Sequence, residues 1–246
     1  MALVMKRAGD AKREDLYHKI LFYGDSGAGK TWLVASGKKI AILLTERNGE
    51  QSIRLSNPDA LYVFVNSAEG VREFLGMAID GVFKEQGIQL LGIDGLTEIQ
   101  RLFKEDLEEL RGDGEFSIRD WGLLHEKMRG LLRDIPYDVA CTALAQNLEL
   151  GDIHHIRPSF QGKSFADEVM QYFNAVGYAY KRGATGRSGG MRAKQADQVE
   201  STTEHVVMFD GPSRIKCKNC HPLRGIIANK SLADMLDILK SADGES

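Results

Sequence analysis

The sequence predicts an α/β fold with a mostly parallel central sheet flanked by helices and with antiparallel strands toward the C-terminus. Residues 24–31 fit the pattern G-x-x-x-x-G-K-[ST] and directly follow the apolar run 19–23. Apolar runs then alternate with amphipathic segments as far as Gln146, which is typical of parallel strands covered on both faces. Beyond Gln146 the pattern changes, and the segment 183–204 lies between two predicted strands, which favours a hairpin.

Short apolar runs predict the strands of this sheet. In chain order these runs are 19–23, 39–45, 60–65, 89–94, 138–144, 175–180, 205–209 and 214–218. Helices are predicted between and after them, at 31–36, 69–85, 96–110, 118–134, 164–172 and 231–239. Ser231 is a suitable N-cap for the last helix, and the segment 147–163 is expected to be a long loop.

Length and composition indicate one globular unit. The chain has 246 residues, 43% of them hydrophobic, so we expect a single domain over 1–246, with 1–17 as an N-terminal extension and 183–204 as a flexible hairpin loop. No run is apolar enough for a signal peptide or a membrane span, and three cysteines fit a reducing compartment. We therefore expect a soluble, cytoplasmic protein without membrane contact.

The motif at 24–31 predicts a phosphate-binding loop. Its glycines let successive backbone N–H groups point at phosphate oxygens, and the following helix adds the positive end of its dipole. Lys30 is expected to reach the β- and γ-phosphates, and Thr31 to bind Mg²⁺. The predicted nucleotide-binding residues are Gly24, Asp25, Ser26, Gly27, Ala28, Gly29, Lys30 and Thr31.

Three polar residues end predicted strands and are therefore expected at one edge of the sheet, where open α/β sheets bind ligands. Asp94 ends the run 90–94 and is the candidate carboxylate for the Mg²⁺ site. Gly95 follows it where many phosphate-loop ATPases have a glutamate, so the catalytic base must come from elsewhere, and Glu46 at the end of the neighbouring strand is the candidate. Gln146 is the candidate sensor of the γ-phosphate.

Two predicted strands separate the phosphate loop from the strand that ends at Asp94, an order that suggests the branch of phosphate-loop ATPases with an extra strand between the two nucleotide motifs. With Glu46 and the strand ending in 145–147, this order resembles the RecA-like recombination ATPases, in particular small phage-encoded ATP-binding proteins of single-strand annealing and recombination. The resemblance covers about 19–239. It implies ATP and Mg²⁺ as cofactors, DNA-stimulated hydrolysis, single-stranded DNA as partner and a host cytoplasm as location.

Contacts with DNA must be local, because the net charge of −3 excludes a uniformly basic surface. In RecA-like proteins the segment after the sensing glutamine is a mobile DNA-binding loop, and the corresponding 147–163 offers Arg157, Phe160 and Lys163, although Glu149 and Asp152 weaken its attraction for phosphate. A second basic segment, 181–194, contains the DNA-binding candidates Arg182, Arg187 and Arg192; a solvated hairpin tip is the alternative.

The run 214–218 alternates charged and apolar residues, so Lys216 and Lys218 are expected on one strand face. Their spacing matches a Lys-x-Lys pair that in RecA reaches the ATP of the neighbouring subunit. The resemblance therefore implies a homo-oligomer, either a ring or a filament, with these lysines supplied across the boundary. A solvated edge strand is the alternative interpretation.

Two other functions fit the same loop. The chain is a small-molecule kinase if 182–194 is a lid over an acceptor phosphate, or an assembly switch with little turnover if Glu46 points away from the nucleotide. A single-strand-binding or annealing protein is a further expected partner. Cys217, Cys220 and His221 form a C-x-x-C-H pattern, but a haem or structural zinc site is not expected because the chain lacks an export signal and a convincing fourth zinc ligand.

Overall fold

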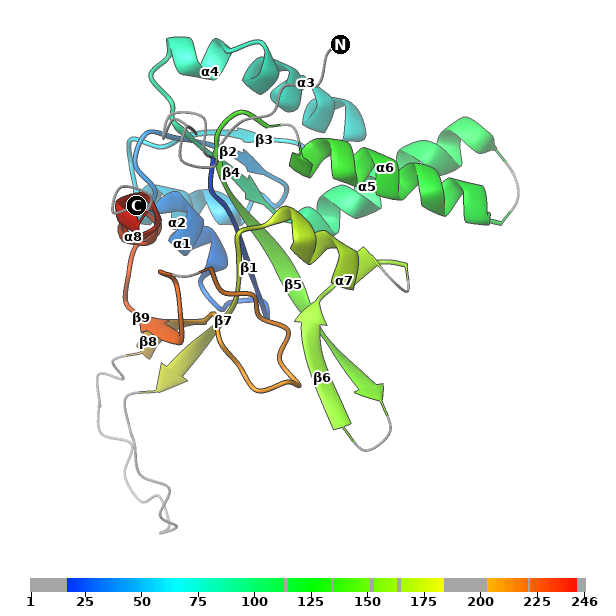
Figure 1. The fold of residues 1–246 in the computed structure, drawn as a ribbon. Coiled ribbons are helices and arrows are strands. Elements are labelled where there is room, and N and C mark those ends of the chain that lie inside the picture. Colours follow the sequence, from blue (N-terminus) through cyan, green and yellow to red (C-terminus); the bar gives the residue numbers. More distant parts are fainter. Residues whose placement is uncertain are drawn as a thin grey trace, which may run out of the picture.

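In a computed structural model, the chain folds around one twisted β-sheet with helices on both faces (Figure 1). The structure describes residues 17–112, 115–133, 135–150, 153–162, 165–183, 203–220 and 222–242. Among them, none of the helices is long and apolar enough to cross a membrane.

The described strands form a single sheet in the order β3-β2-β4-β5-β1-β7-β8-β9, with β6 paired to β5. Their bounds are β1 Lys19–Gly24, β2 Ile40–Leu44, β3 Leu61–Phe64, β4 Leu90–Asp94, β5 Asp138–Leu150, β6 Ile153–Pro158, β7 Ala175–Gly183, β8 Thr203–Met208 and β9 Ile226–Ala228. The strands from β3 to β7 are parallel, whereas β6, β8 and β9 are antiparallel to their neighbours. This confirms the predicted fold class, and β5 is the extra strand between β1 and β4.

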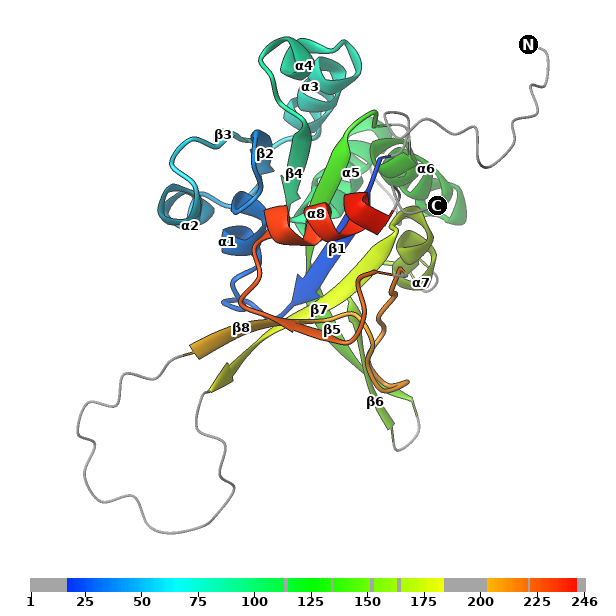
Figure 2. The same cartoon turned by 60° about the vertical axis from the view of Figure 1, so that its left-hand side comes forward.

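Helices cover the sheet in two groups (Figure 2). Their bounds are α1 Lys30–Ala35, α2 Gly49–Ser56, α3 Ala68–Ile79, α4 Val82–Glu85, α5 Leu96–Arg111, α6 Ile118–Arg133, α7 Phe165–Glu168, the 3-10 helix η3 Val169–Tyr172 and α8 Leu232–Ala242. On β1, Ile20 and Phe22 pack into the core with α1 and α8, whereas Leu21 and Tyr23 pack into the core with α3, α5 and α6. Both faces of the central strand are therefore buried, as its unbroken apolar sequence requires.

Several predicted elements differ from the structure. The helix expected at 69–85 is interrupted at Gly81, whose φ of 83° ends one helix and caps the next. The loop expected at 147–163 is largely the β5–β6 hairpin. The strand expected at 214–218 is instead a loop that makes isolated bridges at Ile215 and Lys218, and β9 was not predicted.

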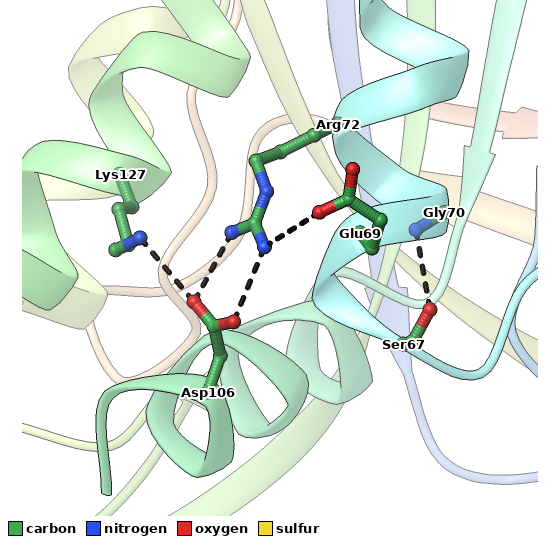
Figure 3. A network of polar contacts seen from close by, with 6 residues as sticks. All are labelled: Ser67, Glu69, Gly70, Arg72, Asp106 and Lys127. Atoms are coloured by element: carbon green, nitrogen blue, oxygen red, sulfur yellow. Dashed lines mark hydrogen bonds and ion pairs between the residues drawn. The ribbon is translucent and has the colours of Figure 1, made fainter. Parts of the chain in front are cut away.

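An ion-pair network holds α3 against α5 and α6 (Figure 3). Arg72 donates to both carboxylate oxygens of Asp106 at 3.1 Å and to Glu69 at 3.1 Å, and the Lys127 ammonium lies 3.4 Å from Asp106. At the start of α3, Ser67 Oγ accepts a hydrogen bond from the N–H of Gly70 and caps the helix. Hydrogen bonding from Arg72 lowers the pKa of Asp106, so the carboxylate is a satisfied structural anion.

Candidate nucleotide site

The turn between β1 and α1 follows the phosphate-loop motif. Gly27 and Gly29 adopt φ of 78° and 89°, which favours glycine, and Gly29 is the N-cap of α1. Gly24 lies so close to β7 that a Cβ there would be 2.2 Å from the carbonyl oxygen of Ala179. Glycine is therefore required in this turn for two reasons: Gly27 and Gly29 adopt positive φ, and Gly24 has no room for a side chain.

Lys30 is bent back over the loop. Its ammonium donates to the carbonyl oxygens of Gly24 at 2.9 Å and Asp25 at 2.8 Å. Burial lowers the pKa of Lys30, and the carboxylates of Asp94, Asp25 and Glu46 act in the opposite direction. The loop thus holds a partly desolvated cation beside its own backbone.

Asp94, at the end of β4, is 7% exposed and lies within hydrogen-bonding distance of two hydroxyl groups. Thr31 Oγ1 donates to Oδ2 at 2.8 Å, and Thr142 Oγ1 donates to Oδ1 at 2.6 Å. Burial raises the pKa of Asp94 despite these bonds and the nearby Lys30 ammonium. The structure therefore brings Asp94, Thr31 and Lys30 together, although they come from two different strand-to-helix connections.

These groups line a cavity of about 530 Å³ at the carboxyl edge of the sheet. Its lining is made of the phosphate loop, the ends of β2 and β4, the middle of β5, the first turns of α2 and α5, and side chains from β7 and β8. It comprises Ser26, Gly27, Gly29, Lys30, Thr31, Trp32, Thr45, Glu46, Asn48, Gly49, Ser52, Asp94, Gly95, Thr97, Glu98, Thr142, Ala143, Leu144, Lys181 and His205. The volume is sufficient for a nucleotide-sized ligand.

Two glutamates lie at this cavity. Glu46 is exposed, follows β2 and acts electrostatically on Lys30. Glu98, in the first turn of α5, forms ion pairs with Arg101. Since Glu98 is engaged by a cation, Glu46 is the carboxylate that is better available to a water molecule in the cavity.

The sequence interpretation missed several side chains of this site, including Thr142, Trp32, His205 and Lys181. Trp32 stacks on His205 with ring centroids 5.8 Å apart, and His205 Nδ1 lies 3.3 Å from the carbonyl oxygen of Ala28. Lys181 of β7 also lines the cavity. Trp32 follows Thr31 directly and was visible in the motif, whereas His205 is contributed by β8, far along the chain, and gave no local signal.

Gln146 is not at a strand end. β5 continues past it to Leu150, so Gln146 lies opposite Arg157 in the β5–β6 hairpin and is absent from the cavity lining. Its side-chain oxygen, in the orientation that satisfies the amide, accepts from Arg157 Nε at 2.7 Å and from a second guanidinium nitrogen at 3.1 Å. The expectation that Gln146 meets the nucleotide directly is therefore wrong in this structure.

The DNA-binding candidates are separated by the fold. Phe160 is 5% exposed and packs edge-on against Phe165, so the expected stacking on DNA is wrong, because this side chain belongs to the core. Arg157 is mostly buried beside Asp167, and Arg182 forms an ion pair with Glu204. The remaining candidates, Lys163, Arg187 and Arg192, lie outside the described residues. Most of the proposed lid and of the predicted hairpin loop also lies outside them.

The two lysines expected on one strand face have different surroundings. Lys218 donates to the carbonyl oxygens of Phe173 at 2.5 Å and Met170 at 3.3 Å, so its ammonium serves its own chain. Lys216 is 45% exposed and lies 3.7 Å from Asp167. The expectation that Lys218 is a cation supplied across a subunit boundary is therefore wrong, and so is the alternative of a solvated edge strand, since the segment is not a regular strand.

The donor set fits a nucleotide with its magnesium ion. Backbone N–H groups at the start of α1, the Lys30 ammonium and an open glycine turn suit phosphate oxygens. Thr31 and Asp94 offer hard oxygen ligands that already lie 2.8 Å apart. Thr31, Asp94 and Lys30 would hold this ligand in the cavity.

Comparison with known proteins agrees with this geometry. A family profile described as "AAA domain" matches residues 17–221. None of the curated proteins matches the chain. Among solved structures, the assembled ATPase EscN from the type III secretion system of enteropathogenic E. coli is 17% identical, with a TM-score of 0.46 over 67% of this chain and 43% of that one. This chain therefore spans less than half the length of that relative.

The family match runs from the residues before β1 to the loop before β9, and so includes the phosphate loop, Asp94 and the cavity between them. The match and the geometry lead to the same conclusion: this chain belongs to the AAA domain family of phosphate-loop ATPases.

Proposed function

We propose that this protein binds and hydrolyses ATP as a RecA-like protein that acts on single-stranded DNA in phage-type recombination, annealing or repair. The observation that carries the ATPase part is the hydrogen bond of 2.8 Å between Thr31 and Asp94, with the Lys30 ammonium beside them. A magnesium ion, when bound, neutralises phosphate charge at this point.

Each residue of the cavity has a distinct task in this proposal. Lys30 leaves its carbonyl partners and binds the β- and γ-phosphates, while the loop N–H groups hold the phosphate chain. Glu46 orients or deprotonates the attacking water. Thr142 holds the carboxylate of Asp94 in place by donating to Oδ1.

The DNA part of the proposal depends on β5. Thr142, Ala143 and Leu144 of this strand line the cavity, and Gln146 pairs with Arg157 only two residues farther along. A shift of β5 on nucleotide binding is therefore transmitted to the β5–β6 hairpin. Gln146 reports the nucleotide state through this strand instead of through contact.

Assembly into a ring or a filament extends this proposal. Lys218 is not a candidate for a cation supplied to the neighbouring subunit, because its ammonium is bonded to its own chain. A single-strand-binding or annealing protein is the further partner that we propose, in the cytoplasm of a phage host.

The test is the rate of ATP hydrolysis with and without an unstructured oligo(dT), with Lys30→Ala as the blank. We expect Mg²⁺-dependent hydrolysis that oligo(dT) accelerates. Hydrolysis that is indifferent to oligo(dT) but accelerated by a small phosphoryl acceptor would replace the DNA role with a kinase. Binding of ATP with negligible turnover under all conditions would favour an assembly switch.

A further inference from the structure

Arg157 is a cation that the fold holds in a fixed position. Its side chain is only 14% exposed, and Gln146 accepts two of its N–H groups, at 2.7 and 3.1 Å. An amide oxygen orients a guanidinium group without neutralising its charge. Arg157 is therefore preorganised and retains the capacity to bind an anion.

Asp167 bridges this arginine to a lysine from another part of the chain. The carboxylate lies 3.4 Å from Arg157 and 3.7 Å from Lys216, and 54% of its side chain is exposed. Both distances exceed the 2.7–2.9 Å or so of a strong charge-assisted hydrogen bond. Asp167 is thus loosely held and accessible to solvent.

The backbone fixes the two cations side by side. Ile156 donates its N–H to the carbonyl oxygen of Arg214 at 2.7 Å, and Lys216 donates its own to that of Ile156 at 2.9 Å. The segment that carries Lys216 therefore lies against β6 next to Arg157. The neighbouring Glu168 is engaged elsewhere, since it pairs with Arg129 at 3.2 Å and accepts from Tyr172.

We propose that Arg157 and Lys216 form a binding site for one phosphodiester of single-stranded DNA, and that Asp167 occupies this site until the strand displaces it. The inference rests on the proposed function and names the contact by which the hairpin meets DNA. Two cations share one carboxylate in this group, so a positive charge remains for an incoming phosphate. Asp167 thereby lowers the affinity for DNA and makes it depend on displacement.

The site has a direct connection to the nucleotide. Gln146 holds Arg157, and the same strand carries Thr142, which donates to Asp94. A change at Asp94 therefore reaches the arginine through four residues of β5. Affinity for DNA is expected to respond to the nucleotide through the position of Arg157.

The experiment measures the anisotropy of a labelled oligo(dT) as a function of salt, with a non-hydrolysable ATP analogue present. Asp167→Asn removes the competing charge and is expected to tighten binding about fivefold. It also steepens the slope of log K against log salt by about 0.7, as one more phosphate contact would. Adding Lys216→Ala to this variant returns both quantities toward wild type.

The matched control is Asp237→Asn, which removes the same charge from an exposed ion pair with Lys38 on the face that carries α8. Equal gains in Asp167→Asn and Asp237→Asn, in a wild type that binds oligo(dT), would overturn the phosphodiester site alone. Absence of oligo(dT) binding in all three proteins would overturn the proposed function itself. Inorganic phosphate at equal ionic strength competes for the same two cations and is expected to reduce the gain; a gain that phosphate leaves unchanged would overturn the site.

Discussion

Asp94 at the sheet edge and Asp106 in the helix layer are both surrounded by hydrogen-bond donors, yet the fold shifts their pKa values in opposite directions. Asp106 receives two N–H groups from Arg72 and faces Lys127, and its pKa is lowered (Figure 3). Asp94 is more deeply buried and receives two hydroxyl groups, and its pKa is raised.

The difference separates a structural anion from a functional one. The Asp106 carboxylate is matched by cations in its own network, so its charge stabilises the fold. The Asp94 carboxylate is buried with neutral donors and one shared ammonium, so part of its charge is uncompensated. A buried carboxylate with uncompensated charge is expected to bind a cation. Its burial destabilises the folded state, and binding of the cation offsets this loss of stability.

The largest effect is expected from Lys30→Ala, because this variant removes the ammonium group of the phosphate loop. Loss of a preorganised charge donor to the phosphates should lower ATP hydrolysis about a thousandfold. Nucleotide binding, measured by calorimetry, should disappear as well. Lys38→Ala, on an exposed side chain, is the control and should hydrolyse ATP at the wild-type rate. Normal nucleotide binding by Lys30→Ala would contradict the assignment of the loop.

Glu46→Gln tests which glutamate activates water. The amide keeps the shape of the side chain but is not a base, so turnover should fall about a hundredfold while ATP binding is retained. Glu98→Gln is the matched variant at the same cavity, and it should retain turnover because Glu98 pairs with Arg101. The reverse result would transfer the role of base to Glu98.

Gly95→Ala tests how the backbone after Asp94 supports the site. Gly95 has a φ of 108°, and a Cβ there would be 2.2 Å from Thr45 Oγ1, which donates to the carbonyl oxygen of Asp94. We expect a loss of about 3 kcal/mol in the free energy of unfolding, measured in urea. Gly122→Ala, in an open helical position, should be neutral or slightly stabilising. A comparable loss in both variants would refute a local cause.

Features that depend on residues close together in the chain were predicted correctly, whereas several that depend on distant residues were not. The phosphate loop, the parallel strands and the strand end at Asp94 were predicted because each depends on a local pattern of glycines or apolar residues. Gln146 was misplaced because the strand was taken to end there. A signal for the hairpin was present, since Gly151 and Asp152 separate two short runs, and apolar residues alternate with polar ones in the first of them.

Other features had no local signal. His205 reaches the phosphate loop because β8 pairs with β7, and this pairing joins segments that are far apart in the chain. Phe160 was expected on a DNA-binding loop, but its burial depends on Phe165 and the helices around it. Lys218 was expected at a subunit boundary or on a solvated edge strand, but its ammonium donates to carbonyl groups of η3 and of the residue after it. These contacts are set by tertiary packing.

Asp94→Asn sharpens the comparison of the two carboxylates. Because the folded pKa of Asp94 is raised, its charge opposes folding as pH rises above the ordinary range of a carboxyl group. The amide should therefore increase the free energy of unfolding of the ligand-free protein at neutral pH, by about 1 kcal/mol. The gain should disappear below about pH 4, where both states of the wild type are protonated. Added Mg²⁺ and ATP should stabilise the wild type but not this variant.

Asp106→Asn is expected to change stability by a similar amount with the opposite sign, and its effect is the smallest overall because ATP hydrolysis is not affected. The folded pKa of Asp106 is lowered, so its stabilising contribution is present above the ordinary carboxyl pKa and is lost as pH falls through the folded value. Since Arg72 is 41% exposed, solvent screening limits the loss at neutral pH to about 1 kcal/mol. Urea unfolding at pH 7 and at pH 3 would measure it, and ATP hydrolysis should be unchanged. If Asp94→Asn and Asp106→Asn shift stability in the same direction at pH 7, the distinction between a functional and a structural carboxylate is wrong.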